Sequence, residues 1–565
     1  MQKFIGLKKS ILLLGLLTTV NNTMKTRGII AIVILLLCAN PSFSQEGFFR
    51  IYSSEGNKCS NSCVSYADKG NYIVAINNDF YNEGCAKLFK LSPEGNIVGS
   101  AFIDEPGSAF SLYNIFRHPT LPDSYVGTGL YSFPDSIPSA FDFSLPYFIQ
   151  FDGQLNITRR ETLEHELFNR KSMLGMRTML NEDCNIFCEY INFTPSIPLS
   201  DFHRLFVEMS LDGDLLRVVD DPDTIDLQPF GSISLALFEI PSTHETVSYR
   251  YGNPELTPGY PGQIHKFIKI HDDYSTEVIN ESSRFGNDTL SYNVNYISTR
   301  YNMLQNSPAT ALPLNDSTLL FSIQANEHWY QGWPTLDSNL FITDISSVLF
   351  KTDLEGNMKD FLVVNSYNDT IDVVPVTSIA LTKEDATGHK MIFHCRYSQY
   401  KESWENPNTL TITKLTDDFE ILWQRSYTVP DVYLEAHHLL ATNDDGCLVT
   451  GAVTRGCNLP YSFGVREEWF ALKLNADGTV GTDEDNLVVR PYAFYPNPVK
   501  EQVLMQFSPD VQPAQVELYD LQGRLARRKN KAFESIDLSR MPTGTYTLRV
   551  TLEDGKTYTD KVVKE

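Results

Sequence analysis

The side chains of this sequence that could take part in binding chemistry are mainly aromatic rings. Six of them lie in connections rich in Tyr, Trp and Pro, and they are the candidates for a shared ligand face: Trp329, Tyr330, Trp333, Tyr400, Trp404 and Tyr461. Flat rings bury a large area at a small cost in side-chain entropy, which suits stacking on sugars or peptide segments. The same rings could instead pack the connections against one another, so both interpretations remain open.

Motifs that would indicate catalysis are scarce. The sequence contains no HExxH motif, no GxSxG nucleophile elbow and no phosphate-binding glycine loop. His437 and His438 follow Glu435 and form the only pair of adjacent histidines, and we expect them to be structural because no third ligand follows at a suitable spacing. The carboxylates are too numerous for a glycosidase-like pair to be identified. We therefore assign no catalytic, cofactor-binding or metal-binding residue. A polysaccharide- or peptide-degrading enzyme is the alternative to a binding protein.

Acidic side chains dominate the middle of the chain. Residues 46–489 carry 29 Lys and Arg against 60 Asp and Glu, whereas residues 490–565 carry 12 against 10. Nucleic acid and anionic membranes are bound through Lys and Arg, so neither is an expected partner. The acidic segments 220–223 and 483–485 could hold calcium through carboxylate oxygens, but their spacing matches no known calcium loop. We expect solvated turns there, and calcium is the only cofactor left open.

A repeat organises the middle region. An apolar run ending in a turn of Asp or Gly occurs seven times, and the last residues of these units are Gly95, Gly153, Gly213, Asp273, Gly356, Asp418 and Gly478. The steps between them are 58, 60, 60, 83, 62 and 60 residues. A second β-branched and aromatic run precedes each turn, as in residues 72–76 and 125–129. A fixed period of this length is typical of a repeat architecture.

Seven such units predict an all-β chain with a seven-bladed β-propeller over residues 46–485, since radial closure shelters all but short strand edges. Residues 48–52 are expected to supply the outer strand of the last blade. If the Asp/Gly turns join the third and fourth strands of each blade, the aromatic connections lie between the second and third strands and share the opposite face. A pair of β-sandwiches is the alternative, but it would not explain one period repeated seven times.

The end of the chain has a different pattern. Residues 494–565, after a linker at 486–493, begin with Phe494-Tyr495-Pro496-Asn497-Pro498 and continue to Gly523. They end with Gly544-Thr545-Tyr546 and a final strand that contains Lys561. Apolar and polar residues alternate here, which predicts a small antiparallel immunoglobulin-like sandwich of about seven strands.

This ordered set closely resembles the type A C-terminal sorting domain of the Bacteroidetes type IX secretion system. The resemblance implies export through the periplasm to the medium or the outer-membrane surface. It also implies recognition by the type IX translocon and removal by a sortase-like protease, which can attach the cargo to anionic lipopolysaccharide. It leaves the glycan or protein ligand of the middle region unidentified. An ordinary accessory immunoglobulin-like domain is the alternative.

The beginning of the chain agrees with export. Residues 24–44 contain the basic, apolar and small-residue regions of a secretory signal, so Met24 is the expected start and 1–44 the expected signal region. No other apolar run approaches the length of a membrane helix. Without Cys38, eight cysteines remain, and an even number permits disulfides in a secreted chain. Cys85 and Cys457 are one candidate pair, between the first and last blades.

Overall fold

The structure is a computed structural model. It describes residues 47–53, 59–68, 70–78, 86–103, 109–132, 144–168, 172–181, 183–193, 202–221, 233–240, 243–252, 264–282, 311–325, 346–354, 358–365, 373–385, 388–400, 409–430, 432–455, 468–483, 488–495 and 499–564. These residues form β-strands, turns and one short 3-10 helix, η1 (Glu166–Phe168), so the all-β class is confirmed. Within these ranges no helix has the length and apolarity needed to span a membrane. The predicted signal region lies outside them.

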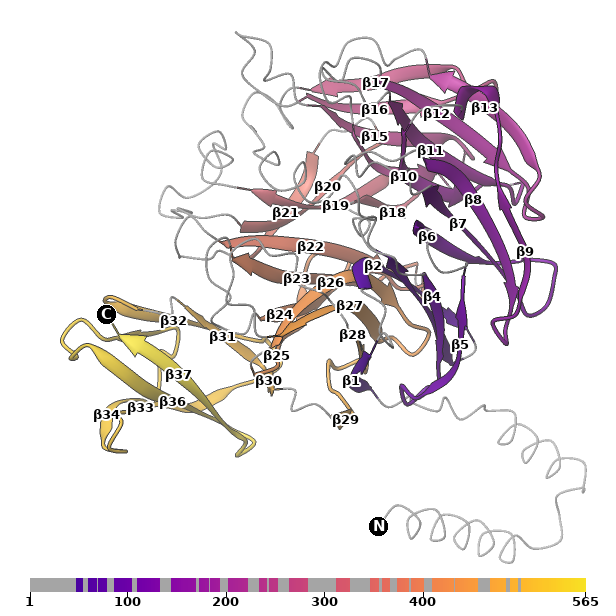
Figure 1. Cartoon of the computed structure of the whole chain (residues 1–565). Helices are drawn as coiled ribbons and strands as arrows, with labels where there is room; N and C mark the ends of the chain where they lie inside the picture. Colours follow the sequence, from indigo (N-terminus) through magenta and orange to yellow (C-terminus); the bar gives the residue numbers. More distant parts are fainter. Residues whose placement is uncertain are drawn as a thin grey trace, which may run out of the picture. The chain divides into compact units, whose positions relative to one another are not determined.

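Seven of the described sheets follow one another along the chain (Figure 1). In the first six, four consecutive strands pair in sequence order, and in the seventh three consecutive strands do so. Sheet 1 contains β2 (Cys59–Asp68), β3 (Asn71–Asn78), β4 (Lys87–Leu91) and β5 (Ile97–Phe102). Sheet 2 contains β6 (Ala109–Arg117), β7 (Ser124–Ser132), β8 (Ser144–Asp152) and β9 (Ile157–Thr162). Sheet 3 contains β10 (Ser172–Leu180), β11 (Ile186–Phe193), β12 (Phe202–Met209) and β13 (Leu215–Asp221). Sheet 4 contains β14 (Ile233–Glu239), β15 (Thr246–Gly252), β16 (Ile264–Ile270) and β17 (Thr276–Ser282).

The last three of these sheets include two additions to the basic pattern. Sheet 5 contains β18 (Ala311–Asn315), β19 (Thr318–Ala325), β20 (Ser346–Thr352) and β21 (Met358–Asn365). Sheet 6 contains β22 (Val373–Leu381), β23 (Ile392–Tyr400), β24 (Leu410–Leu415) and β25 (Ile421–Thr428), and β30 (Val488–Arg490) pairs with its outer edge. Sheet 7 contains β26 (Val432–Ala441), β27 (Cys447–Arg455) and β28 (Glu468–Leu474), followed by β1 (Phe48–Ser53) and the two-residue β29 (Thr482–Asp483).

The fourth strand of sheet 7 comes from the beginning of the described chain. β1 pairs antiparallel with β28, from Phe48 opposite Lys473 to Ser53 opposite Glu468. This confirms the prediction that residues 48–52 add the outer strand of the last unit. The predicted strand pairs are also confirmed in all seven units, because the second and third strands of each sheet contain the runs identified in the sequence.

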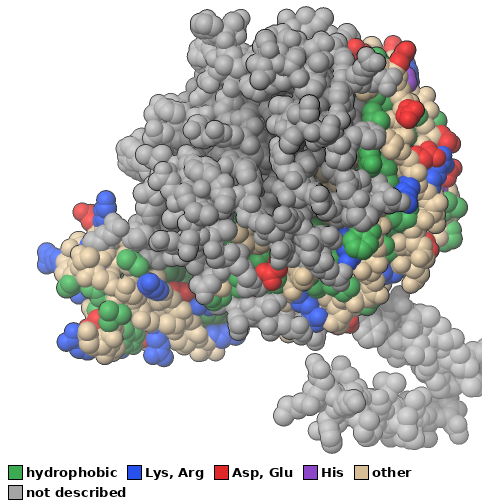
Figure 2. Space-filling view, in the orientation of Figure 1, with side chains coloured by type: hydrophobic (Ala, Val, Ile, Leu, Met, Phe, Trp, Pro, Cys, Tyr) green, Lys and Arg blue, Asp and Glu red, His purple; other side chains and the backbone are tan. Residues whose placement is uncertain are grey.

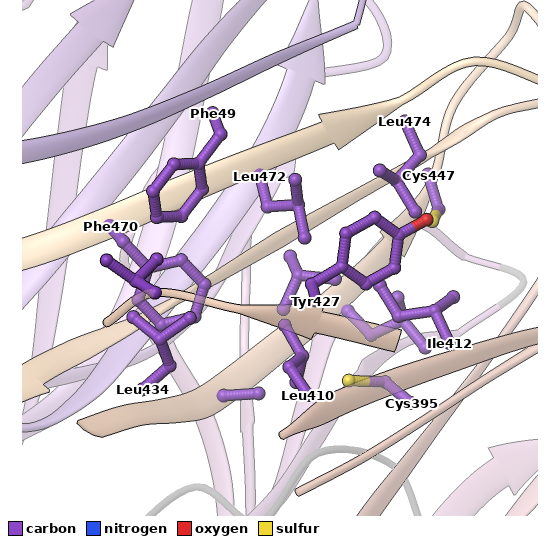
Figure 3. Close-up of a cluster of buried hydrophobic side chains, with 14 of the residues drawn as sticks. Phe49, Cys395, Leu410, Ile412, Tyr427, Leu434, Cys447, Phe470, Leu472 and Leu474 are labelled. Atoms are coloured by element: carbon purple, nitrogen blue, oxygen red, sulfur yellow. The ribbon is translucent and has the colours of Figure 1, made fainter. Parts of the chain in front are cut away.

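Apolar side chains fill the spaces between successive sheets. On β3, Ile73 and Ala75 join a cluster shared with sheet 2, while Tyr72, Val74 and Ile76 join a cluster shared with sheet 7. Successive side chains of a strand point to opposite faces, so a strand covered on both faces is apolar at every position. This explains the continuous apolar run at residues 72–76 of β3. Figure 3 shows the cluster between sheets 6 and 7, in which the ring centroid of Phe49 on β1 lies 6.2 Å from that of Phe470.

The tight turns that follow the third strands share one backbone conformation. The fourth residue of the turn has a positive φ in the six described cases, namely Gly95, Leu155, Gly213, Tyr274, Phe419 and Gly478. In each, the amide of this residue donates to the carbonyl three positions earlier. Beside the turns at Gly95, Leu155, Gly213 and Phe419, the strand pairing also shifts by one residue. This is a type I turn with a bulge, which favours glycine or a residue that tolerates a left-handed conformation.

Where glycine occupies the turn, an aromatic ring of the preceding sheet fills the space beside it. A Cβ added at Gly95 would lie 2.5 Å from the Phe48 ring, and one added at Gly213 would lie 2.6 Å from the Phe148 ring. Where the residue is not glycine, its own side chain is buried between the sheets, as for Leu155 (2% exposed). Each turn therefore helps to pack its sheet against the one before.

The strands after β30 form two further sheets. The three-stranded sheet contains β31 (Tyr492–Tyr495), β32 (Gln502–Phe507) and β35 (Ser535–Asp537). The four-stranded sheet contains β34 (Leu525–Lys529), β33 (Pro513–Tyr519), β36 (Gly544–Leu552) and β37 (Thr557–Lys564). Both contribute to one buried cluster, with Val503 and Met505 from the first sheet and Leu518 and Leu548 from the second. We refer to residues 492–564 as the tail.

Candidate functional site

The second and third strands of each sheet are joined at the end opposite the tight turns. The predicted ligand face falls in these connections, and Trp329, Tyr330, Trp333, Trp404 and Tyr461 lie outside the described residues. Tyr400 is the last residue of β23, where its backbone pairs with Val373. The structure thus places Tyr400 at the strand end from which one such connection departs, and the binding face remains a prediction.

A buried ionic cluster lies in sheet 3. Arg204 on β12 contacts Glu189 on β11 through Nε, 2.7 Å from Oε1, and its Nη1 lies 3.7 Å from Oδ2 of Asp221 on β13. Sheet 4 supplies two more donors, because the Ser248 hydroxyl bonds Glu189 at 3.1 Å and the Thr276 hydroxyl bonds Asp221 at 3.3 Å. Both carboxylates are fully buried. Paired charges of this kind hold strands in place, and their burial keeps them from acting on a bound substrate.

A serine and a histidine form a second buried polar contact, between sheets 5 and 6. Ser347 Oγ on β20 lies 2.9 Å from His394 Nε2 on β23, a distance at which a histidine could act as a base. Both side chains are fully buried. Burial, aided by the positive charge of Arg396, lowers the pKa of His394 to about 3. A neutral imidazole with no access to solvent is a structural hydrogen-bonding group, so this pair is not a nucleophile and base.

The adjacent histidines lie on β26, as part of the sheet. His437 Nε2 is 3.5 Å from Glu435 Oε2, and both side chains are buried. The pairing of β26 with β27 shifts between Ala436 and His438, so His437 sits in a bulge. Of the acidic segments considered for calcium, Asp221 belongs to the buried cluster with Arg204. In the described ranges no three His, Cys, Asp or Glu side chains come together as a metal site.

The side chains of four cysteines are described, and all four are free thiols. Cys184 is exposed, whereas Cys188, Cys395 and Cys447 are buried. Burial raises the pKa of Cys188 to about 11 and that of Cys447 to about 12, so both remain protonated and unreactive at neutral pH. The even number of cysteines permits disulfides, but none of them involves these four thiols. The candidate pair Cys85 and Cys457 lies outside the described residues.

Basic side chains connect successive sheets near the tight turns. Arg159 on β9 bonds the Asp212 carbonyl and, at 3.1 Å, the Asp214 carboxylate in the turn of sheet 3. Arg217 on β13 donates to the carbonyls of Asp272 and Asp273, at 3.2 and 2.9 Å, in the turn of sheet 4. The sequence interpretation missed these contacts. A signal was present, because both arginines lie four residues after the positive-φ position of their own unit.

Of the predicted sorting residues, four are described. Gly523 has a φ of 74° in the turn between β33 and β34, where the Asp520 carboxylate accepts the amides of Gln522 and Arg524. Tyr546 is buried and donates to the Pro542 carbonyl at 2.7 Å. Gly544 begins β36, and the exposed Lys561 on β37 pairs with Thr547. Pro496, Asn497 and Pro498 lie outside the described residues. In Figure 2 Lys and Arg side chains are spread over the tail.

Comparison with known proteins identifies the tail. Residues 493–565 match the family model described as secretion system C-terminal sorting domain. The chain is accordingly a type IX export substrate that is secreted or held at the cell surface. A sequence comparison with curated proteins found no match.

Several solved structures are distantly similar to the chain. A member of the DUF4221 family from Bacteroides vulgatus is 9% identical with a TM-score of 0.34, covering 79% of this chain and 99% of that one. The β-propeller domain of the Trilobed protease from Pyrococcus furiosus is 10% identical with a TM-score of 0.36, covering 78% and 99%. A polysaccharide lyase of family PL25, an ulvan lyase, is 8% identical with a TM-score of 0.40, covering 78% and 98%. None of these likenesses is high enough to carry over an activity.

Proposed function

We propose that this exported protein is a seven-bladed β-propeller that binds a glycan or protein ligand at the face formed by its long connections. Contacts between neighbouring sheets support the ring. The first strand of each of the seven sheets contacts that of the next, in the order β2, β6, β10, β14, β18, β22 and β26, and β26 contacts β2. A shared apolar cluster also joins sheet 7 to sheet 1, through Trp469 and Tyr72. This cyclic order is the observation that carries the proposal.

Binding is favoured over catalysis by the state of the described polar groups. Glu189, Asp221 and His394 are fully buried, and each contacts a neighbouring side chain. They therefore stabilise the sheets. The connections at the opposite end from the tight turns hold the aromatic residues of the predicted ligand face. The tail follows as a sandwich-like sorting domain, with the type IX translocon, a sortase-like protease and anionic lipopolysaccharide as its proposed partners.

The proposal can be tested by thermal unfolding of the chain from residue 46 onward against a panel of polysaccharides and host proteins, with product analysis of every mixture. A ligand that binds only the folded state raises the melting temperature by mass action. We expect such a rise without products, and its loss in Trp329→Ala and Trp333→Ala. Phe102→Ala is the matched control, because Phe102 is an exposed ring (54%) on the outer strand of sheet 1. Products that disappear on substitution of one carboxylate would establish the enzyme instead.

A further inference from the structure

The segment that leads into the tail is paired with the edge of sheet 6. β30 runs antiparallel to β25, with Arg490 opposite Ser426 and Val488 opposite Thr428. Arg490 also bonds the tail, because its Nε donates to the Asp560 carboxylate on β37 at 2.9 Å and its Nη2 donates to the Thr559 carbonyl at 2.8 Å. This short strand is therefore attached on one side to the sheet and on the other to the tail.

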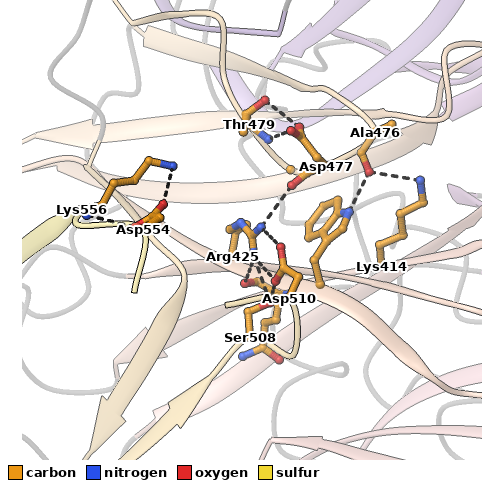
Figure 4. A network of polar contacts seen from close by, with 12 residues as sticks. Lys414, Arg425, Ala476, Asp477, Thr479, Ser508, Asp510, Asp554 and Lys556 are labelled. Carbon is orange, nitrogen blue, oxygen red and sulfur yellow. Dashed lines mark hydrogen bonds and ion pairs between the residues drawn. The ribbon is translucent and has the colours of Figure 1, made fainter. Parts of the chain in front are cut away.

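Next to this pairing, one arginine of sheet 6 contacts the tail directly (Figure 4). Arg425 Nη1 donates to Ser508 Oγ and to Asp510 Oδ1, each at 2.9 Å, and Nη2 donates to Asp510 Oδ2. The backbone amide of Gln424 donates to the same Ser508 hydroxyl at 2.8 Å. Arg425 and Ser508 are both buried, at 8% and 3% exposure. A bidentate, charge-assisted contact between Arg and a carboxylate is among the stronger polar contacts in proteins.

The electrostatics of Asp510 fit a contact formed by the charged carboxylate. Burial alone would raise its pKa, but the hydrogen bonds from Arg425 and Ser508 outweigh this effect and hold the pKa below its ordinary value. The carboxylate is therefore ionised at neutral pH and paired with the guanidinium.

Comparison with sheet 2 shows what the tail contributes. There Arg159 bonds a turn carbonyl of the next sheet together with Asp214, the residue after Gly213. Arg425 likewise bonds a turn carbonyl of the next sheet, that of Asp477 at 3.3 Å. The residue after Gly478 is Thr479, which has no carboxylate. Asp510 of the tail supplies a carboxylate to Arg425 in its place.

We propose that the contact of Arg425 with Ser508 and Asp510 is a latch that holds the sorting domain against sheet 6 and shields the segment from Val488 to Tyr495 from proteolysis. Cleavage there requires β30 to leave the edge of β25, because a strand held in a sheet cannot enter the extended groove of a protease. Breaking the latch makes this opening more frequent. The sheets before the tail, which we call the body of the protein, thereby control access to the segment that joins them to the sorting domain.

The test is limited proteolysis of the full chain by a protease of broad specificity, with cleavage sites identified by mass spectrometry. Asp510→Ala removes the carboxylate from the tail and leaves the contact of Arg425 with Asp477 in place. When opening is fast, cleavage follows the population of the open form, so we expect this variant to be cut between Val488 and Tyr495 about tenfold faster or more. Tryptophan fluorescence shows whether the body stays folded, because all five Trp residues precede residue 490.

Arg159→Ala is the matched control, since it removes a guanidinium that bonds a turn carbonyl of the next sheet at another junction. This variant is expected to leave cleavage between Val488 and Tyr495 at the parental rate. Equal rates for Asp510→Ala and the parent, or first cuts elsewhere in both, would overturn the latch. Faster cleavage in Arg159→Ala to the same extent would also overturn it, because the effect would then come from general destabilisation.

Discussion

The Tyr427 hydroxyl donates a hydrogen bond to the Gly478 carbonyl, 2.8 Å away, across the junction between sheets 6 and 7. The same contact recurs at the junction between sheets 7 and 1, where the Tyr52 hydroxyl bonds the Gly95 carbonyl at 2.7 Å. Tyr52 lies on β1, so the contact made within the continuous chain is repeated where the N-terminal strand completes the last sheet. The two junctions are thus built alike.

Removing either hydroxyl should weaken its junction. Tyr52→Phe and Tyr427→Phe each leave a buried carbonyl with one partner fewer, so we expect the free energy of unfolding to fall by about 1–3 kcal/mol. Chemical denaturation followed by tryptophan fluorescence measures it, since all five Trp residues lie in the body. Tyr519→Phe is the control, because its hydroxyl bonds Glu517 within the tail. Equal stability of all three variants and the parent would contradict the role of these hydroxyls.

Gly95 should be the least replaceable residue of its turn. Alanine at this position is expected to destabilise the fold in two ways, because the φ of 80° is unfavourable for it and its Cβ would lie 2.5 Å from the Phe48 ring. At Gly388 the φ is 87° and the nearest atom is 3.7 Å away, so Gly388→Ala meets only the first. The left-handed conformation costs about 1–2 kcal/mol. Denaturation curves should show a larger loss for Gly95→Ala than for Gly388→Ala, and equal losses would show that the ring moves aside freely.

The ionic cluster of sheet 3 should be sensitive to loss of its cation. Arg204→Met leaves Glu189 and Asp221 buried without their guanidinium, and breaking a buried pair in this way costs about 3–5 kcal/mol. Lys269→Met is the comparison, because Lys269 pairs with Glu245 at partly exposed positions (25% and 38%) and such pairs contribute about 1 kcal/mol or less. Denaturant midpoints give both values. A loss for Arg204→Met no larger than that for Lys269→Met would contradict the importance of the cluster.

His394 should make stability depend on pH. Its pKa in the folded chain is about 3, below the roughly 6.5 of an unfolded chain, so the unfolded state binds more protons at acid pH. The contribution of His394 to the free energy of unfolding is therefore constant above about pH 6.5. It falls by about 1.4 kcal/mol per pH unit as the pH drops from 6.5 toward 3.

The comparison of melting temperatures at pH 7.5 and 5.0 isolates this effect. His394→Gln keeps an amide for the contact with Ser347 but cannot be protonated, so part of the acid sensitivity should disappear. His389→Gln serves as the control, because a hydrogen bond from its ring to the Asp417 carboxylate raises the pKa of the exposed His389, and its contribution has the opposite sign. Identical pH dependence in His394→Gln and the parent would contradict the prediction.

The sequence was sufficient for the strands because their pattern is local. Residues 72–76 are apolar at every position, since both strand faces are covered, and the turn residues mark where each strand ends. The positive φ at Tyr274 and Phe419 was not predicted, because these residues favour other conformations and are held here by burial between sheets. The contacts of Glu189 and Arg425 were also missed, since their partners come from distant strands or from the tail. Such contacts depend on how distant segments pack together, so the local spacing of residues in the sequence does not predict them.

The proposed closed ring can be tested most directly by joining β1 to β28 covalently. Ser53 lies opposite Glu468, and residues directly opposite in an antiparallel pair are close enough for a disulfide. In a chain carrying Ser53→Cys and Glu468→Cys, we predict that mild oxidation links the two introduced thiols, as seen by mass spectrometry of the digested protein, and raises the melting temperature. Ser53→Cys alone should give neither result. A folded double variant whose introduced thiols stay free, or pair with other cysteines, would contradict the closure of the ring by the N-terminal strand.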